Sequence, residues 1–177
     1  MKIFINPGHG DNDSGAVNHG KYKNQSEMYE CNIALRIGQK VKSYLENVGY
    51  EVILFQFDGL KVITDKANNS NADLFVSIHC NSFNESARGT ETFCYYNSVS
   101  GRKLATCIQN QLIASIPTID RGVKENGYYV LRCTDCPAAL VECAFIDQDD
   151  DADLLVNYEN DFAKAIARGV TDYVAKA

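Results

Sequence analysis

Three short apolar segments of the chain each end at an ionisable side chain. They are residues 2–8, which precede His9, residues 73–78, which precede His79, and residues 138–141, which precede Glu142. Apolar runs of this length, rich in β-branched residues and bounded by Gly, Asn or Pro, predict buried strands. Open α/β sheets bind ligands in the crevice beyond the carboxyl ends of their strands. We therefore expect His9, His79 and Glu142 to meet at one edge of a sheet.

The rest of the pattern alternates between helical and extended periodicity. Ile33, Ile37 and Val41 recur at helical spacing within residues 29–48, and Gly49 provides a stop signal for that helix. The other expected elements are a strand at 51–55, a helix at 60–69, a strand at 88–96 suited to a sheet edge, a helix at 101–116, strands at 128–132 and 137–145, and a helix at 161–173. This alternation predicts an α/β fold, with a mostly parallel sheet of about six strands flanked by helices.

A polar segment follows the first predicted strand. Residues 10–24 are dense in Gly, Asn, Asp, Ser and Lys. A segment of this length without periodicity inside a compact domain is usually functional or disordered, and this one directly follows His9. His19 lies within the segment, with no strand end beside it, and we expect its side chain to face solvent.

Length and composition restrict the classes of protein to which the chain can belong. The 177 residues, 45% of them hydrophobic, suffice for a full core, so we expect a single domain over residues 1–177 and a monomer. A net charge of -6 without a block of Lys or Arg argues against a nucleic-acid partner. No segment approaches the roughly 20 apolar residues of a membrane span, and no signal-peptide h-region precedes the first strand. We expect synthesis in the cytoplasm without a Sec-type export signal.

Seven cysteines are scattered along the chain, most of them inside apolar patterns. A free cysteine in such a setting behaves as a small hydrophobic side chain, so we expect reduced core thiols. Cys133 and Cys136 have C-x-x-C spacing without a second such pair or flanking histidines, which favours a structural or incidental role over redox pairing. The acidic run 149–151 lacks the spacing of a calcium loop and is interpreted as a solvated helix start.

The two histidines at strand ends are candidate ligands of a catalytic zinc ion. Such a site takes three protein ligands and leaves one position for water, and two His with one Glu form a known ligand set. Either histidine alone is better explained as a polar loop residue, but His9 and His79 together favour a metal. The third ligand is then Glu30, which shares the helix face that packs on the sheet, or Glu27, one turn earlier. The helix macrodipole also favours acidic residues in a first turn, without any metal.

Glu142 lies inside an apolar strand, where a charge is costly unless it is paired or used. Burial beside a metal centre raises the pKa of a carboxyl group toward neutrality and suits it to general acid and base catalysis. The alternative is a buried salt bridge, for example to Arg121 or Arg132.

The motifs along the chain resemble those of a known family. They are INPGHG followed by DSGA, SIHCNS, GTETFCY, RGVK and PAALVECAFI, in this order. Over essentially its whole length the chain is similar to the zinc-dependent N-acetylmuramoyl-L-alanine amidases that cut bacterial peptidoglycan, whose fold is a twisted, mostly parallel sheet flanked by helices. The resemblance implies that His9, Glu30 and His79 bind one zinc ion and that Glu142 is catalytic.

The resemblance also bears on the choice between the two glutamates. In the family, the distance from the ligand Glu to the turn that closes the helix favours Glu30 over Glu27. The family's usual Glu-Lys or Glu-Ser context is missing, because Glu30 is followed by Cys31.

The same resemblance implies an activity and a substrate. The expected reaction is hydrolysis of the amide bond that joins the lactyl group of MurNAc to L-Ala of the peptidoglycan stem peptide. Asn81 would then orient neighbouring groups or contact substrate, and residues 121–124 would meet carboxylates of the stem peptide or form a solvated basic loop.

Two other functions remain compatible with these residues. One is that of another zinc exopeptidase or amide hydrolase on a similar sheet, and the other is that of a non-catalytic peptidoglycan-binding module. For an amidase the expected site of action is the cell wall, and a phage or prophage lysin fits the expected lack of an export signal.

Overall fold

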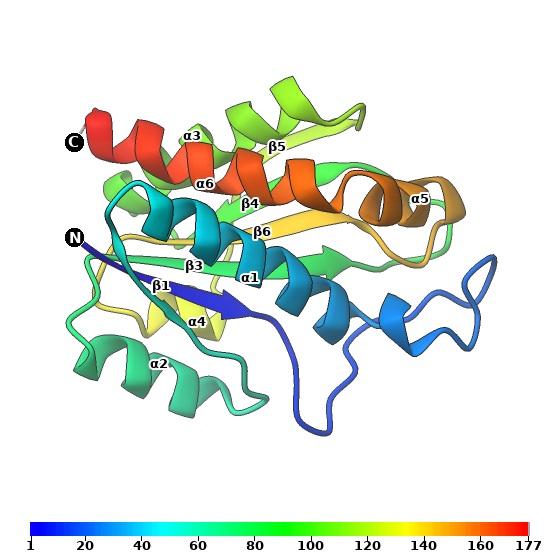
Figure 1. Cartoon of the computed structure of the whole chain (residues 1–177), viewed down its shortest axis with the longest axis horizontal. Coiled ribbons are helices and arrows are strands. Elements are labelled where there is room, and N and C mark those ends of the chain that lie inside the picture. Colours follow the sequence, from blue (N-terminus) through cyan, green and yellow to red (C-terminus); the bar gives the residue numbers. More distant parts are fainter. Residues whose placement is uncertain (177) are drawn as a thin grey trace.

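The computed structural model describes residues 1–176 and shows a central sheet with helices on both faces (Figure 1). Within this range the sheet has six strands in the order β2-β1-β3-β6-β4-β5. The strands are β1 (Lys2–Pro7), β2 (Glu51–Leu54), β3 (Leu74–Asn81), β4 (Thr90–Cys94), β5 (Asp120–Glu125) and β6 (Ala138–Phe145). Among the strand pairs of residues 1–176, β4 with β6 is the one antiparallel pair. The predicted α/β fold with a mostly parallel sheet is confirmed.

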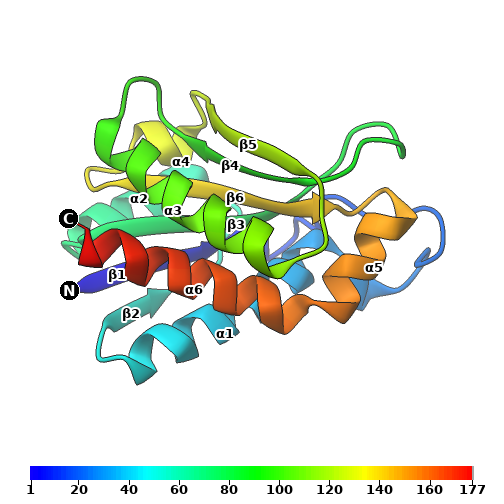
Figure 2. The ribbon, with the colours of Figure 1, turned by 90° about the horizontal axis from the view of Figure 1, so that it is seen from above.

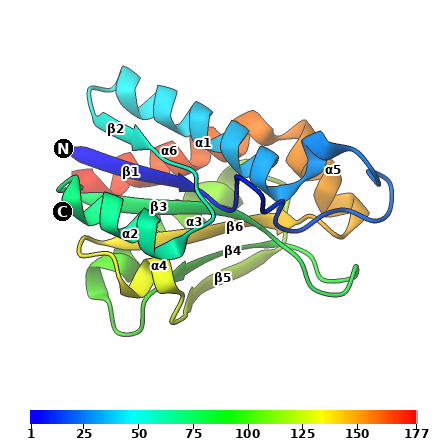
Figure 3. The same ribbon diagram turned by 90° about the horizontal axis from the view of Figure 1, so that it is seen from below.

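Two layers of helices bury the two faces of the sheet (Figure 2 and Figure 3). One layer consists of α1 (Glu30–Asn47), α3 (Val99–Ser115) and α6 (Glu159–Ala175), the other of α2 (Leu60–Asn69) and α4 (Tyr129–Arg132), and α5 (Asp149–Asn157) joins β6 to α6. Ile3 and Ile5 pack under the first layer, whereas Phe4, between them, packs under the second. Burial of both faces explains why the parallel strands are almost continuously apolar. No helix within residues 1–176 is both long and apolar enough to cross a bilayer.

The three strands that precede His9, His79 and Glu142 are neighbours in the sheet. β3 lies between β1 and β6, and the three run parallel. Pro7 pairs with Ile78, and His79 pairs with Glu142. Because the carboxyl ends of parallel strands meet at one edge, the chain delivers the three polar side chains to the same end of the sheet.

Two of the predicted elements differ from the structure. Residues 128–132, predicted as a strand, include the short helix α4, whose Val130 and Leu131 are buried against the sheet. A short apolar run does not distinguish a strand from a buried helical turn. The sixth strand is instead β5, whose polar sequence DRGVKE is tolerated because an edge strand is paired on one side. The predicted strand at 88–96 is therefore not at an edge but is paired on both sides, as β4.

The acidic run 149–151 begins a helix, as expected, but its third member is not solvated. Asp151 is 1% exposed. Its Oδ2 accepts hydrogen bonds from the backbone N–H groups of Gly89 (2.8 Å) and Phe145 (3.0 Å). The prediction of a solvated run is wrong for Asp151, because this carboxylate ties the end of β6 to the loop before β4.

The cysteines are free thiols in the part of the chain that the structure describes. Cys80, Cys94, Cys107 and Cys143 are buried, in agreement with their apolar sequence contexts. The C-x-x-C pair, half-buried, follows α4.

Helix α6 packs against α3 without room for a side chain at Gly169. A Cβ atom there would lie 2.4 Å from the Cα atom of Ile108. The end of a flexible side chain can rotate away from such a contact, but a backbone atom cannot. We therefore expect Gly169→Ala to lower the free energy of unfolding by about 1–3 kcal/mol, which urea unfolding followed by circular dichroism measures.

The matched control for this substitution is Gly127→Ala. A Cβ atom at Gly127 would lie 3.2 Å from the ring of Tyr96, an exposed side chain that can rotate away. An equal loss of stability in the two variants would contradict the packing explanation.

Candidate metal centre and active site

The turn after β1 brings His9 next to His79. His9 has a φ of 57°, in the left-handed region, and its ring centroid lies 5.2 Å from that of His79. Gly8 permits this approach, since a Cβ atom there would lie 2.2 Å from Cε1 of His79. The glycine that precedes His9 is thus a packing requirement of the site.

Glu30, at the start of α1, joins the two histidines. Its side chain is buried, with Oε2 lying 3.1 Å from Nε2 of His9 and Oε1 lying 2.9 Å from Nδ1 of His79. The backbone N–H groups of Ala16 and Cys80 donate to the same two oxygens, at 2.8 Å and 3.1 Å. These contacts offset the cost of removing a carboxylate from water.

The structure separates the two candidate glutamates. Glu27 is exposed in the short 3-10 helix η1 (Ser26–Met28), where its backbone carbonyl accepts a hydrogen bond from Arg36. The extended backbone of Tyr29 interrupts the helical path between η1 and α1. Glu30 therefore contacts the histidines, and Glu27 lies outside the cluster.

Asp13 supports His9 from within the polar loop. Its Oδ2 lies 2.7 Å from Nδ1 of His9, and its Oδ1 accepts a hydrogen bond from the backbone N–H of Gly15. A carboxylate on one ring nitrogen orients an imidazole whose other nitrogen binds metal. The sequence marked residues 10–24 as a functional or disordered segment without distinguishing Asp13, because an irregular loop has no periodicity that predicts where a side chain points. His19, in the same loop, is exposed as expected.

The donor atoms of this cluster fit a zinc ion. One atom from each of His9, Glu30 and His79 lies within 4.8 Å of the other two. Two imidazole nitrogens and one carboxylate oxygen form a ligand set of catalytic zinc, which leaves a coordination position open. The three residues that the sequence predicted as ligands are therefore brought together in a form that can hold the metal.

Contacts within the cluster shift the pKa values of its members. The hydrogen bond to Glu30, opposed by partial burial, raises the pKa of His9 to about 9. Burial opposes ionisation of Glu30, but the hydrogen bonds to His79 and His9 outweigh it and hold the pKa of Glu30 well below its usual range. In the absence of metal, His9 therefore carries a proton that a metal ion must displace.

Glu142 lies at the same end of the sheet as the His, Glu, His cluster. The residue is half-buried, and among the described residues its Oε2 is shielded from solvent and has no hydrogen-bond partner. Burial raises the pKa of Glu142 well above its usual range, and the charges of Glu30 and Glu91 act in the same direction. A carboxyl group in this state is suited to accept and return a proton near neutral pH.

The salt bridges considered for Glu142 are not formed. Arg121 donates from Nε to Glu91 at 2.8 Å, and Arg132 is exposed, with its guanidinium over an aromatic ring. Asn81 also donates to Glu91, at 2.8 Å. Among residues 1–176, the ionic contacts of this region therefore converge on Glu91, and none involves Glu142.

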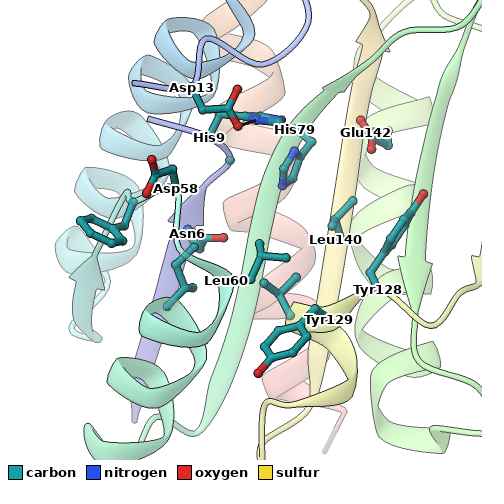
Figure 4. Close-up of a pocket in the computed structure, with 14 residues that line it drawn as sticks. Asn6, His9, Asp13, Asp58, Leu60, His79, Tyr128, Tyr129, Leu140 and Glu142 are labelled. Carbon is teal, nitrogen blue, oxygen red and sulfur yellow. Dashed lines mark hydrogen bonds and ion pairs between the residues drawn. The ribbon is translucent and has the colours of Figure 1, made fainter. Parts of the chain in front are cut away.

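A cavity of about 360 Å³ lies beside the cluster (Figure 4). His9, His79 and Glu142 line its polar end. The apolar part of the wall is formed by Phe57, Leu60, Ile63, Val130 and Leu140. A cavity with an apolar wall and a few converging polar groups is the usual form of a small-molecule or peptide site.

Tyr128 is a cavity residue that the sequence did not reveal. Figure 4 shows it on the side of Glu142 away from His79. Its ring packs edge-on against Phe93, with the centroids 5.2 Å apart. Burial and the nearby charge of Glu142 raise the pKa of the phenol. The sequence pattern assigned Tyr128 to a predicted strand, which gave no indication that it lines a cavity. In the structure Tyr128 directly precedes α4.

The chain matches known proteins over almost all of its length. Residues 3–172 match the family described as N-acetylmuramoyl-L-alanine amidase. The protein YqiI of Bacillus subtilis is 38% identical, over 97% of this chain and 84% of YqiI. N-acetylmuramoyl-L-alanine amidase LytC of the same species is 37% identical over 97% of this chain, which spans 35% of LytC.

A solved structure agrees with the fold. The N-acetylmuramoyl-L-alanine amidase from Clostridium difficile 630 superposes with a TM-score of 0.91 and 34% sequence identity. The match covers 98% of this chain and 96% of that one. The architecture described above is therefore shared almost completely with that protein.

Removal of the central carboxylate should weaken zinc binding. We expect Glu30→Ala to reduce zinc affinity by more than about 100-fold, because partners that merely orient metal ligands already contribute about 10–100-fold. Competition with a chromogenic chelator measures the affinity, and circular dichroism verifies that the variant is folded. Glu27→Ala is the matched control and should bind zinc like the parent protein. Unchanged affinity in Glu30→Ala would refute its assignment as a ligand.

Zinc affinity should also rise with pH. His9 has a pKa of about 9 in the metal-free protein, so lowering the pH below that value reduces its neutral fraction about tenfold per unit. We expect the apparent Kd for zinc to be about tenfold larger at pH 6.5 than at pH 7.5. Calorimetry in two buffers with different ionisation enthalpies counts the released protons. Affinity independent of pH, without proton release, would exclude His9 as a ligand.

Proposed function

Because the chain belongs to the N-acetylmuramoyl-L-alanine amidase family, we propose that it hydrolyses the amide bond between the lactyl group of MurNAc and L-Ala of the peptidoglycan stem peptide. One observation carries this proposal. A His, Glu, His cluster that fits zinc lies at one end of a cavity that Glu142 also lines. The two parts together supply what amide hydrolysis requires, a site for a Lewis acid and a group that transfers protons.

In this proposal His9, Glu30 and His79 hold one zinc ion. When bound, zinc supplies a Lewis acid that promotes ionisation of water near neutral pH and stabilises negative charge on a carbonyl oxygen. Asp13 keeps the His9 ring oriented through Nδ1. The backbone amides of Ala16 and Cys80 hold the Glu30 carboxylate between the two rings.

Glu142 transfers the proton between the two halves of the reaction. Its Oε2 has no competing hydrogen bond among the described residues, so the carboxylate is available to take a proton from the attacking water. The same carboxyl group then donates that proton to the amide nitrogen as the C–N bond breaks, so that the peptide leaves as a neutral amine. The raised pKa of Glu142 supports both steps, because the group must hold the proton between them.

The proposed unit of function is a catalytic domain that comprises residues 1–177. Its substrate is peptidoglycan, and its site of action is the bacterial cell wall. The apolar wall of the cavity supports this role, since it excludes water from the region beside the reacting amide and strengthens the electrostatic interactions there.

Replacement of the proposed catalytic carboxyl group tests the mechanism. We expect Glu142→Gln to bind zinc like the parent protein and to lose amidase activity by at least about 100-fold, because the amide cannot accept the proton. Mass spectrometry of a muropeptide digest measures the reaction through the release of stem peptides that carry a free L-Ala amine, while the glycan stays intact. Glu46→Gln, at an exposed position of α1, is the control and should retain full activity.

The same digest separates the other functions. Cleavage between amino acids of the stem peptide would indicate a peptidase, and zinc-loaded protein without any turnover would indicate a binding module. A fully active, zinc-loaded Glu142→Gln variant would refute the role given to Glu142.

A further inference from the structure

A pair of cations lies on the edge strand β5, two strands from Glu142. Arg121 Nε lies 2.8 Å from Oε2 of Glu91, and the Lys124 ammonium contacts the same oxygen. Glu91 is 4% exposed, whereas the side chains of Arg121 and Lys124 are 33% and 40% exposed. One buried carboxylate thus faces two cations that solvent can reach, and this cationic cluster (Glu91, Arg121, Lys124) keeps one unbalanced positive charge.

A β-bulge turns both cations toward Glu91. Arg121 and Lys124 are three residues apart, so in a regular strand they would point to opposite faces of the sheet. The register between β4 and β5 shifts here, so that Arg121 and Gly122 together oppose the single residue Glu91. Gly122 has a φ of 78°, a conformation that favours glycine. Bulges of this kind re-aim side chains next to active sites.

The strand order aligns the cationic cluster with the proposed active site. Glu91 pairs directly with Glu142 across β4 and β6, so the two carboxyl groups share one face of the sheet. Figure 3 shows the strand order β3-β6-β4-β5. His79 pairs with Glu142 and Glu142 pairs with Glu91, so these residues follow one another across the strands, with the rest of the cationic cluster on β5. Adjacent strands are about 4.8 Å apart, so β5 lies about 10 Å from β6.

The chemistry of the reaction determines how the substrate is oriented across strands β3, β6, β4 and β5. If the proposed function holds, the acyl part of the amide faces the metal ligands, and the nitrogen faces Glu142, which protonates it. The peptide attached to that nitrogen then extends from β6 toward β4 and β5. Two extended residues span about 7 Å, and the long side chains of Arg121 and Lys124 lean toward β4, so the second residue of the peptide comes within their reach.

We propose that Arg121 and Lys124 bind the free α-carboxylate of the second residue of the leaving peptide. This inference rests on the proposed function and adds to it the orientation of the substrate. Arg121 uses Nε for Glu91 and Nη1 for the Arg88 carbonyl, and a guanidinium has five N–H donors, so donors remain for a second carboxylate. Glu91 is a positioning residue, which holds the two cations at one place.

Two muramyl dipeptides that differ in one group provide the test, both with the γ-carboxyl group of the second residue blocked as a methylamide. The D-isoglutamate form carries the free α-carboxylate, and the D-isoglutamine form carries an uncharged carboxamide in its place. With the zinc-loaded chain, we expect kcat/KM for the isoglutamate substrate to be about three- to tenfold higher, as for a partly solvent-screened charged hydrogen bond. Equal values would overturn the inference.

Substitutions test which residues bind the carboxylate. In the double variant Arg121→Gln/Lys124→Gln, the ratio of kcat/KM for the two substrates should fall to about one. Arg168→Gln, which removes an exposed cation from α6, is the matched control and should keep the parent ratio. A purely structural effect lowers activity on both substrates equally, so it leaves the ratio unchanged. A parent-like ratio in the double variant would therefore overturn the inference.

Product binding distinguishes failure of this inference from failure of the proposed function. The γ-methylamides of L-Ala-D-isoglutamate and L-Ala-D-isoglutamine are titrated into the zinc-loaded protein by calorimetry. Tighter binding of the isoglutamate peptide by the parent protein, lost in the double variant, supports the cationic cluster even if neither muramyl substrate is hydrolysed. Absence of hydrolysis would then count against the proposed function alone. Equal binding of the two peptides by the parent protein would overturn the inference.

Discussion

The burial of Glu30 between two imidazoles is the interaction on which the rest of the site depends. A carboxylate in the interior is costly unless it is paired and hydrogen-bonded. Here the compensation comes from separate parts of the chain, because His9 follows β1, His79 belongs to β3, and the Ala16 amide belongs to the polar loop. The same contacts fix the start of α1 against two strand ends. The protein therefore assembles the donor atoms of the metal site as part of its folding.

Sheet topology explains why so many of the candidate functional side chains lie at the carboxyl ends of β1, β3 and β6. Parallel strands deliver to one edge the residues that follow their carboxyl ends, which is how β1, β3 and β6 supply His9, His79 and Glu142. The antiparallel β4 reaches the same edge with its beginning, and it contributes Glu91 directly opposite Glu142. Cations pair with Glu91, whereas Oε2 of Glu142 has no hydrogen-bond partner in the described part of the chain. Two glutamates on adjacent strands therefore acquire different chemistry from their surroundings.

The sequence was most informative where burial leaves a strong pattern. Continuous apolar runs located the central strands, and the polar residues that end them located the candidate site. Prediction failed where tertiary contacts decide: residues 128–132 carry an apolar run that suits a strand or a helical turn, and β5 is a strand because β4 pairs with it, not because of its own polar residues. Asp13 and Tyr128 were not predicted as site residues. Asp13 lies in a loop without periodicity, and Tyr128 was assigned to a strand that does not form, so in neither case could the direction of the side chain be predicted.

The charged composition of β5 has a consequence for the behaviour of the protein in solution. An edge strand presents unpaired backbone groups on which the edge of another copy can add, and long charged side chains there oppose such intermolecular sheet growth. Arg121 and Lys124, partly exposed on this strand, therefore act as gatekeepers against aggregation. Replacing Arg121 and Lys124 with large hydrophobic residues would therefore make the protein more prone to aggregate, whatever its effect on substrate specificity.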